Sequence, residues 1–238
     1  MRVRPLLPDE AVHSARLHRE VLGMEFLARF GTRFLAAYHR AWIRSPAGLA
    51  LAATDEDDRV AGVMLGTLTP AVHYRWMLLH AGPALVLRLV GGALREPALA
   101  RDLVVTRAAR YVRGVWRYLT APPPRPADPE GPRSGEVTHL MVSPQAQGGG
   151  VGRALLAETE SRAVALGVAR LVLVTPPDLD ARRFYEHLGW EVAGEVTSRS
   201  GEVFVRFVRH LGGAVPLEPA GEAHPEGVGS PDGTAMPT

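Results

Sequence analysis

This 238-residue chain contains neither cysteine nor lysine. Without cysteine there is no disulfide, no thiolate metal ligand and no cysteine nucleophile. Without lysine the chain cannot form a P-loop, whose lysine contacts the phosphates, or a Schiff base with a substrate. All 27 basic residues are therefore arginine, and the formal net charge is only +2. So small an excess of positive charge argues against nucleic acid as a partner.

Long apolar runs are also scarce. The first residues, MRVRPLLPDEAV, lack the apolar core of a signal peptide. The most apolar segment, 77–94, carries His80, Pro83 and Arg88, so it predicts a packed helix, with contact to a membrane surface as the lesser alternative. Together with the absence of cysteine, this pattern predicts a cytoplasmic protein with no membrane span.

The pattern of apolar residues predicts one domain, 1–211, in which strands and helices are interleaved. In its first part we expect a strand over 2–6, a helix from an N-cap at Asp9 to Leu22, a helix over 32–44, a hairpin of strands 48–53 and 59–68 with the turn DEDD, and a helical insertion over 73–119. After a proline-rich loop, 121–135, we expect a strand over 136–142, a helix ending near Gly167, a buried strand over 169–175, a helix over 179–189 and two final strands joined at RSG. Residues 212–238, rich in proline and glycine, are predicted to be disordered.

The stretch VSPQAQGGGVGRALLAE, 142–158, places three consecutive glycines and a fourth, Gly152, at a predicted helix start. The first amides of a helix lack intrahelical partners and favour an anion, and glycine lets them approach it closely. The stretch therefore favours a phosphate site over a simple tight turn. The dinucleotide fingerprint is excluded because its last glycine would fall on Arg153, and a P-loop is excluded because there is no lysine.

The segment Gln147-Gly-Gly-Gly-Val-Gly152, preceded by Val142-x-Pro144, resembles motif A of the GNAT superfamily of N-acetyltransferases. A second stretch, PPDLDARRFYEHLGW, is similar to a pattern that the family often carries, Asn-x-x-Ala-x-x-Phe-Tyr-x-x-x-Gly-Phe. Here Asp178 replaces the asparagine and Trp190 replaces the last phenylalanine. Aspartate keeps an acceptor oxygen but loses the amide donor.

The resemblance implies an α/β (α+β) fold with a mixed, mostly antiparallel sheet of six to seven strands, flanked by helices, with the helical insertion before the central strand. It also implies acetyl-CoA as co-substrate, with no metal, and leaves a homodimer open. The strand 136–142 would splay from its neighbour, so that its backbone could pair with the pantetheine arm. The implied CoA-binding residues are Leu140, Met141, Val142, Gln147, Gly148, Gly149, Gly150, Val151, Gly152, Arg153, Asp178 and Tyr185.

One catalytic role follows from the same resemblance, and a second from the need to deprotonate the acceptor amine. Tyr185 would protonate the departing CoA thiolate, although it could instead be only a core aromatic residue. The base that deprotonates the amine would come from Glu136, Thr138 or His139; strand alternation places the first two on one face and His139 on the other. Glu136, acting directly or through water, is the first choice and His139 the second. Either could instead be structural, as a solvated strand end or a core histidine.

The resulting hypothesis is direct transfer of an acetyl group from acetyl-CoA to a primary amine of a small molecule. A protein N-terminus or lysine is an alternative acceptor, and a catalytically silent CoA-binding regulatory module is an alternative outside enzymes. The arginine-rich stretch 88–117 could form a pocket for an anionic acceptor or a solvated helix face.

Overall fold

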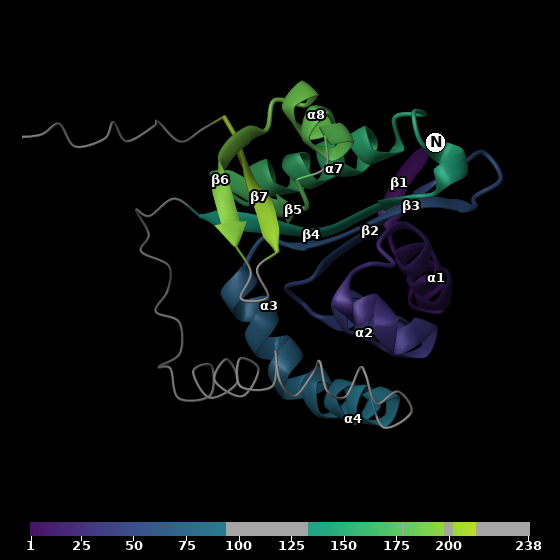
Figure 1. Ribbon diagram of the computed structural model, residues 1–238. Helices are drawn as coiled ribbons and strands as arrows, with labels where there is room; N and C mark the ends of the chain where they lie inside the picture. Colours follow the sequence, from purple (N-terminus) through teal and green to yellow (C-terminus); the bar gives the residue numbers. More distant parts are fainter. Residues whose placement is uncertain (94–132, 178, 198–201, 213–238) are drawn as a thin grey trace, which may run out of the picture.

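The computed structural model describes residues 1–93, 133–177, 179–197 and 202–212. Within these ranges seven strands form one sheet, with helices on both of its faces (Figure 1). The strand order is β1-β2-β3-β4-β5-β7-β6, and only β4 and β5 run parallel. The strands are β1 (Arg2–Pro5), β2 (Leu49–Thr54), β3 (Val60–Thr67), β4 (Ser134–Val142), β5 (Arg170–Thr175), β6 (Glu191–Thr197) and β7 (Val203–His210). The predicted mixed, mostly antiparallel sheet is confirmed.

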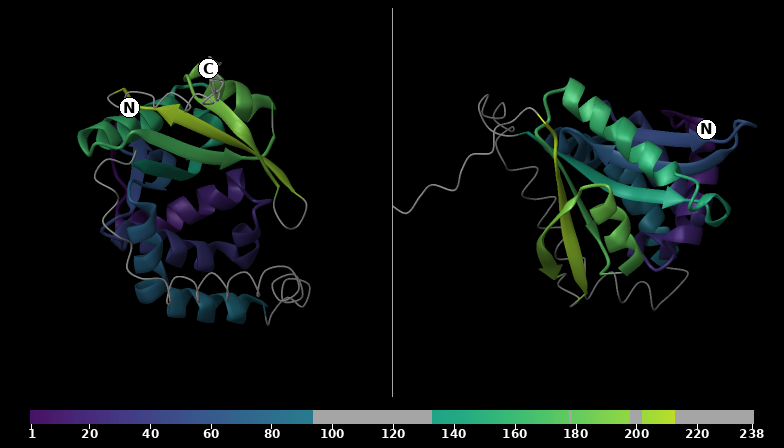
Figure 2. Two further views of the ribbon diagram at one scale, coloured as in Figure 1. Left: turned by 90° about the vertical axis from the view of Figure 1, so that its left-hand side faces the viewer. Right: turned by 90° about the horizontal axis from the view of Figure 1, so that it is seen from above.

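The helices make a layer on each side of the sheet (Figures 1 and 2). One layer contains α1 (Ala11–Val21), α2 (Gly31–Arg44), α3 (Pro70–Trp76) and, packed on α2 away from the sheet, α4 (Gly82–Ala93). The other contains α7 (Val151–Ala165) and α8 (Leu179–His187). Short turns of 3-10 helix lie at Pro8–Glu10, Phe26–Phe30 and Pro144–Ala146, and a π-helical turn, Met77–Ala81, joins α3 to α4.

Each layer of helices buries its own core against the sheet. On the α7 side, Leu155 belongs to the same buried cluster as Leu171 of β5 and Phe207 of β7. On the α1 and α2 side, Trp42 packs with Met141 from β4. Because β4 contributes apolar side chains to both cores, it is fixed from both sides in the middle of the molecule.

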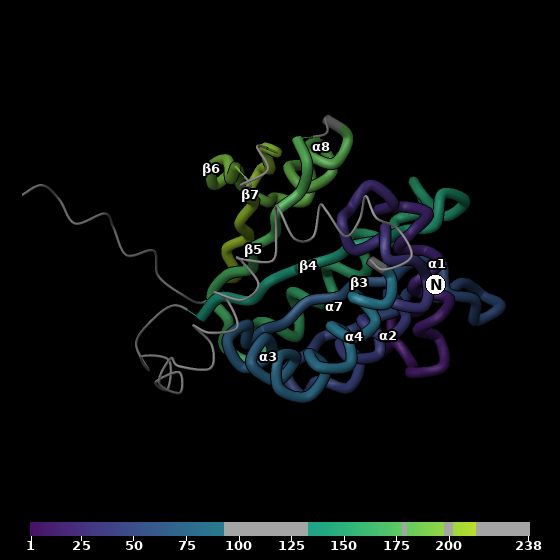
Figure 3. Tube along the Cα trace, turned by 60° about the horizontal axis from the view of Figure 1, so that its bottom comes forward, coloured from purple at the N-terminus to yellow at the C-terminus, as the bar shows by residue number. Residues whose placement is uncertain are grey.

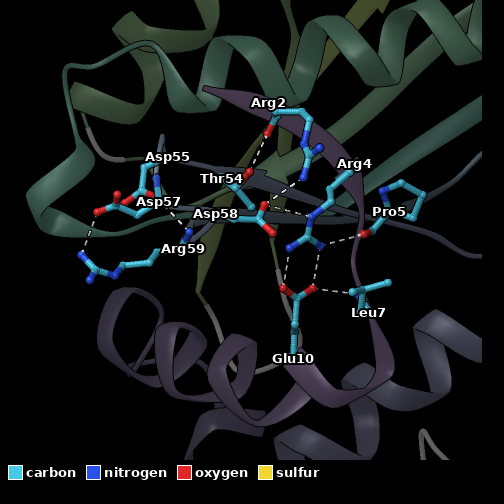
Figure 4. Close-up of polar contacts among 10 residues, drawn as sticks. All are labelled: Arg2, Arg4, Pro5, Leu7, Glu10, Thr54, Asp55, Asp57, Asp58 and Arg59. Carbon is cyan, nitrogen blue, oxygen red and sulfur yellow. Dashed lines mark hydrogen bonds and ion pairs between the residues drawn. The ribbon is translucent and has the colours of Figure 1, made fainter.

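The start of α1 differs from the prediction. Asp9 was expected to be the N-cap, but the chain enters the helix through the 3-10 turn, and Glu10 makes the capping contact. Its carboxylate accepts the backbone N–H of Leu7 at 2.8 Å and pairs with Arg4 at 2.7 Å (Figure 4). A carboxylate held by both a backbone amide and a guanidinium stabilises this turn better than a solvent-facing aspartate.

The predicted DEDD turn between β2 and β3 is present. Asp55 Oδ1 accepts the backbone N–H groups of Asp57 and Arg59, at 3.0 and 2.8 Å, and Asp58 adopts a positive φ of 59° (Figure 4). Aspartate tolerates this left-handed conformation better than most residues, which explains its place in the turn.

Two predicted segments extend beyond the described residues. The helical insertion begins at Pro70 and is helical through Ala93, while its remainder, 94–119, lies outside the described residues. Of the predicted proline-rich loop, 121–132 lies outside them, but Ser134 and Gly135 are part of β4, where Gly135 pairs with Leu171. The predicted disorder of 212–238, of which 213–238 lies outside the described residues, and the boundary of the domain at 211 stay predictions. Among the helices that the structure describes, none has the length and apolarity needed to cross a bilayer.

A buried histidine predicts how stability depends on pH. The ring of His73, in α3, packs at a tilt against Trp42 with ring centroids 3.9 Å apart, and its Nδ1 lies 2.9 Å from Ser45 Oγ. Burial lowers the pKa of His73 to about 4. The unfolded chain, with an ordinary histidine pKa, therefore takes up this proton first, and stability is lost as the pH falls from about 6.5 toward 4.

The substitution His73→Gln removes that titration while keeping a partner for Ser45. We expect the difference in unfolding free energy between pH 7 and pH 5 to be smaller in the variant by about 1 to 2 kcal/mol. Urea unfolding at both pH values measures it. His80→Gln, at an exposed histidine, should keep the wild-type difference. An unchanged pH dependence in His73→Gln would contradict the assignment.

Candidate active site

A groove opens where β4 and β5 separate. Their parallel pairing runs only from Ser134–Val137 to Arg170–Leu173, although β4 continues to Val142. Beyond this point β5 stays paired with β7 and leaves β4 (Figure 3). The predicted splay of this strand is therefore present, and one backbone edge of β4 beyond Val137 lacks a partner in β5.

The groove has a volume of about 660 Å³ and contains most of the residues that the sequence assigned to CoA. Nine of those predicted residues line it: Leu140, Val142, Gln147, Gly148, Gly150, Val151, Gly152, Arg153 and Tyr185. Five residues that sequence reasoning did not assign also line it: Val21, Ala146, Asp180, Ala181 and Phe184. Asp180, Ala181 and Phe184 lie in the second motif beside Tyr185, so helical spacing offered a signal for them. Val21 comes from α1, and no sequence signal pointed to it.

Three other predicted CoA-binding residues do not line the groove. The side chain of Met141 is fully buried on the opposite face of β4, because neighbours in a strand alternate. The N–H of Gly149 donates to the carbonyl of Ala146 at 3.3 Å, so that amide is used within the turn. Asp178 lies outside the described residues.

Three of the four glycines of the turn are needed, for two different physical reasons. Gly148 and Gly150 have φ values of 77° and 78°, a left-handed conformation that side chains disfavour. At Gly152 a Cβ would come 3.0 Å from Phe184 Cζ, so this glycine permits α8 to pack closely on α7. Glycine is therefore needed both for the conformation of the turn and for its close packing against α8.

The same turn presents an anion site. Gly150 is the N-cap of α7, and no side chain caps the helix. The N–H groups of Val151, Gly152 and Arg153 are in the first turn, where a helix supplies no acceptor. That turn carries no acidic residue, so the positive end of the helix dipole is not neutralised. Val151, Gly152 and Arg153 all line the groove.

Tyr185 belongs both to the core and to the groove. Its ring contacts Phe184, Trp190 and Phe207, with centroids 5.1, 5.9 and 5.4 Å away. Burial raises the pKa of Tyr185 to about 12, so the hydroxyl keeps its proton at neutral pH. A packed ring with a protonated hydroxyl at a groove wall suits a proton donor.

A β-bulge changes the expected faces of β4. His139 pairs with Leu65 and Val137 with Gly66, which leaves Thr138 as an extra residue. Gly66 is needed opposite the bulge, because a Cβ there would lie 2.6 Å from the carbonyl oxygen of Glu136. The bulge resets the alternation, and the prediction that His139 faces away from Glu136 is wrong.

Contacts confirm that Glu136 and His139 share the α1–α2 face. Glu136 Oε1 accepts the hydroxyl of Tyr74 at 2.9 Å, and His139 Nε2 lies 3.3 Å from the hydroxyl of Tyr38. Burial and the Glu136 carboxylate hold the pKa of Tyr74 well above its ordinary value, so Tyr74 is the donor. Glu136 is only partly buried, whereas His139 is buried, so of the two Glu136 is the better placed to accept a proton from a ligand.

His139 also takes part in a polar cluster that sequence reasoning did not find. Its Nδ1 lies 3.6 Å from Glu25 Oε2, and the same oxygen lies 3.2 Å from His18 Nε2. Burial lowers the pKa of His18, so its imidazole is neutral at pH 7. Burial by itself would raise the pKa of Glu25, but hydrogen bonding and charge from the facing His139 and His18 outweigh it and lower that pKa to about 2.

Of the arginine-rich stretch, only Arg88 is described. It lines a pocket of about 200 Å³ with Arg40 and Arg44, between α2 and α4. No residue lines both this pocket and the groove. Among the described residues, therefore, this basic pocket is separate from the groove.

Residues 106–190 match the model of the acetyltransferase (GNAT) family. This range contains the glycine turn, β4 and Tyr185. No curated protein sequence matches the chain.

Solved structures share the fold at low sequence identity. A putative GNAT-family acetyltransferase from Desulfovibrio desulfuricans aligns with 88% of this chain and 98% of its own, at 18% identity and a TM-score of 0.51. An aminoglycoside 6'-acetyltransferase type Ii aligns with 89% and 97%, at 15% identity and a TM-score of 0.51. The ribosomal-protein-S18-alanine N-acetyltransferase from Escherichia coli aligns with 91% and 97%, at 12% identity and a TM-score of 0.52.

Proposed function

We propose that this chain, whose residues 106–190 match the acetyltransferase (GNAT) family, is an acyltransferase that transfers an acetyl group from acetyl-CoA directly to a primary amine of a small molecule. One observation carries the proposal: the groove at the separation of β4 and β5 ends at the unneutralised N-terminus of α7. An extended acyl carrier could pair with the open edge of β4, and its pyrophosphate could bind at the N-terminus of α7.

The donor would lie along β4. Its pyrophosphate would accept hydrogen bonds from amides of the Gly148–Arg153 turn, where the backbone approaches without Cβ atoms. Its pantetheine amides would pair with the edge of β4 at Leu140 and Val142, which β5 leaves vacant. A backbone N–H on β4 would then meet the oxyanion that forms on the thioester carbonyl.

Two protons leave the acceptor nitrogen in the proposed reaction. Glu136 takes a proton from the acceptor ammonium, directly or through water, which frees the nitrogen lone pair. The nitrogen attacks the thioester carbon, a C–N bond forms, and collapse of the tetrahedral intermediate breaks the C–S bond. Tyr185 gives its proton to the departing thiolate, and the second proton of the attacking nitrogen leaves as the amide forms and restores the Tyr185 hydroxyl. The absence of cysteine supports direct attack, because no cysteine acyl-enzyme can form.

The base assignment predicts a large kinetic effect. Glu136→Gln keeps an oxygen that accepts the Tyr74 hydroxyl but cannot take a proton, so we expect kcat to fall by about 10²-fold or more. The dissociation constant of acetyl-CoA should not change. Steady-state kinetics and calorimetry measure the two quantities. Glu191→Gln, at an exposed carboxylate of β6, serves as the matched control and should retain the wild-type rate. An undiminished rate in Glu136→Gln removes this residue as the base.

The acceptor class needs its own test, because structures with this fold include an aminoglycoside acetyltransferase and a protein-alanine acetyltransferase. We would incubate the full chain and acetyl-CoA with polyamines, amino sugars, aminoglycosides and peptides bearing free N-termini or lysines. Mass spectrometry of an acetylated small amine would support the proposal. Acetylation of peptides alone would replace it with the protein acceptor. Acetyl-CoA binding without any acetylated product would favour the silent binding module.

A further inference from the structure

The cluster of His18, Glu25 and His139 is not used by the proposed reaction. His18 lies near the end of α1, Glu25 in the loop between α1 and the 3-10 turn Phe26–Phe30, and His139 on β4 directly after the bulge. One ligand atom from each residue, His18 Nε2, Glu25 Oε2 and His139 Nδ1, lies within 4.8 Å of the other two. Three elements thus bring three metal-binding side chains to one point.

The two ring nitrogens that face Glu25 lie within ion-pair distance of its carboxylate but outside hydrogen-bonding geometry. His18 Nε2 and His139 Nδ1 are both buried, and neither meets hydrogen-bonding geometry with the carboxylate or any other group in the described part of the chain. Buried polar atoms that no hydrogen bond satisfies are rare and call for an explanation, of which a missing water or ion is one. Here two such atoms from different elements point at the same carboxylate oxygen.

The opposite nitrogens of these rings are already engaged. His18 Nδ1 lies 3.1 Å from His39 Nε2, and His39 Nδ1 lies 2.7 Å from Ser14 Oγ. His139 Nε2 lies 3.3 Å from the Tyr38 hydroxyl. If these outer nitrogens carry the protons, each ring donates to an acceptor behind it and presents a lone pair toward Glu25. Outer-sphere hydrogen bonds of this kind orient metal-binding histidines in proteins.

We propose that His18, Glu25 and His139 form a binding site for a divalent transition-metal cation of the zinc class. Two imidazoles and one carboxylate are an established zinc-type donor set. Around a tetrahedral zinc ion, donors about 2.0–2.1 Å from the metal lie about 3.3 Å apart. The separations of 3.2 and 3.6 Å from Glu25 already approach this value, so binding needs mainly the two histidines to draw together.

A cation bound to this cluster would have two consequences. It would tie the loop after α1 to β4, next to the strand whose backbone faces the groove. Three protein ligands also leave a coordination position for water or for a donor atom of another molecule. The side chain of Glu25 is 40% exposed, so this side of the cluster is accessible from solvent.

Calorimetry with zinc chloride tests the proposal on the full chain, purified with a tag that contains no histidine and stripped with a chelator. We expect one zinc ion per chain and at least about tenfold weaker binding in Glu25→Gln, which keeps the shape but removes the charge. Glu20→Gln, at an exposed carboxylate of α1, should bind zinc as the wild type does. In the wild type, Co²⁺ should give the strong visible absorption of a tetrahedral site.

Two results would overturn the metal site. One is the absence of zinc binding by folded wild-type protein; in that case the three residues form a hydrogen-bonded cluster only. The other is equal zinc affinity in Glu25→Gln and Glu20→Gln, which would place the ion elsewhere. Acetyl-CoA binding, measured separately on each variant, confirms that the protein is folded. Because the zinc titration uses neither acetyl-CoA nor an acceptor, its outcome is independent of the proposed acetyl transfer.

Discussion

Replacing Gly150 with aspartate is expected to weaken acetyl-CoA binding by about a thousandfold. A Cβ at this position meets no atom within 4 Å, so the new side chain fits without a clash and lies at the groove. Its carboxylate would then face the phosphates. Two like charges about 4 Å apart repel by about 4 kcal/mol near a protein surface, which corresponds to this loss of affinity.

The matched control is Gly150→Asn. Asparagine has nearly the same shape as aspartate and meets the same backbone cost at the φ of 78°, but it carries no charge. Isothermal titration calorimetry on both variants therefore separates charge from strain. Asparagine should retain most of the affinity, and raising the salt concentration should recover part of the loss in the aspartate variant. Equal affinity in the two variants would show that no phosphate lies at this turn.

The glycine turn could be predicted from sequence because its causes are local. The left-handed conformations of Gly148 and Gly150 and the free amides of α7 depend on a few consecutive residues. The order of strands and helices was accessible for a similar reason, since the period of apolar residues changes where the structure changes. The groove follows from these local features once the strands are in place.

The bulge at Thr138 could not be predicted in this way. Nothing in EVTHLMV marks an extra residue, because the bulge is defined by pairing with β3, where Gly66 lies far earlier in the chain. A regular strand was therefore the natural expectation, and it placed His139 on the wrong face. This shift of one residue matters, because it places His139 on the same face of β4 as Glu136 and not in the core on the other face.

The cluster around Glu25 was missed for a related reason. His18 and Glu25 do not share a helix face, since α1 ends at Val21 and the chain reverses through the loop before the 3-10 turn. His139 reaches them only because of the bulge. Tertiary structure alone brings these three residues together, whereas the residues of the CoA groove are mostly close in sequence.

Tyr185→Phe should lower kcat by about 10²-fold to 10³-fold while leaving the dissociation constant of acetyl-CoA unchanged. Phenylalanine keeps the ring contacts to Phe184, Trp190 and Phe207, so packing and stability should be preserved. Only the proton for the departing thiolate is lost. Steady-state kinetics, with calorimetric binding and urea unfolding on the same preparation, test all three parts. A normal kcat in a stable variant would leave Tyr185 as a core residue only.

The pH profile distinguishes this role from that of a group which titrates near neutrality. Because the pKa of Tyr185 is raised to about 12, its hydroxyl is protonated across the accessible range. The ratio of wild-type to variant kcat should therefore stay constant from about pH 7 to about pH 10. A ratio that falls toward one as the pH approaches 10 would mean that Tyr185 loses its proton with an ordinary tyrosine pKa. That outcome would contradict the role of Tyr185 as a buried, neutral acid. The same burial that places Tyr185 in the groove wall raises its pKa and keeps the proton on its hydroxyl.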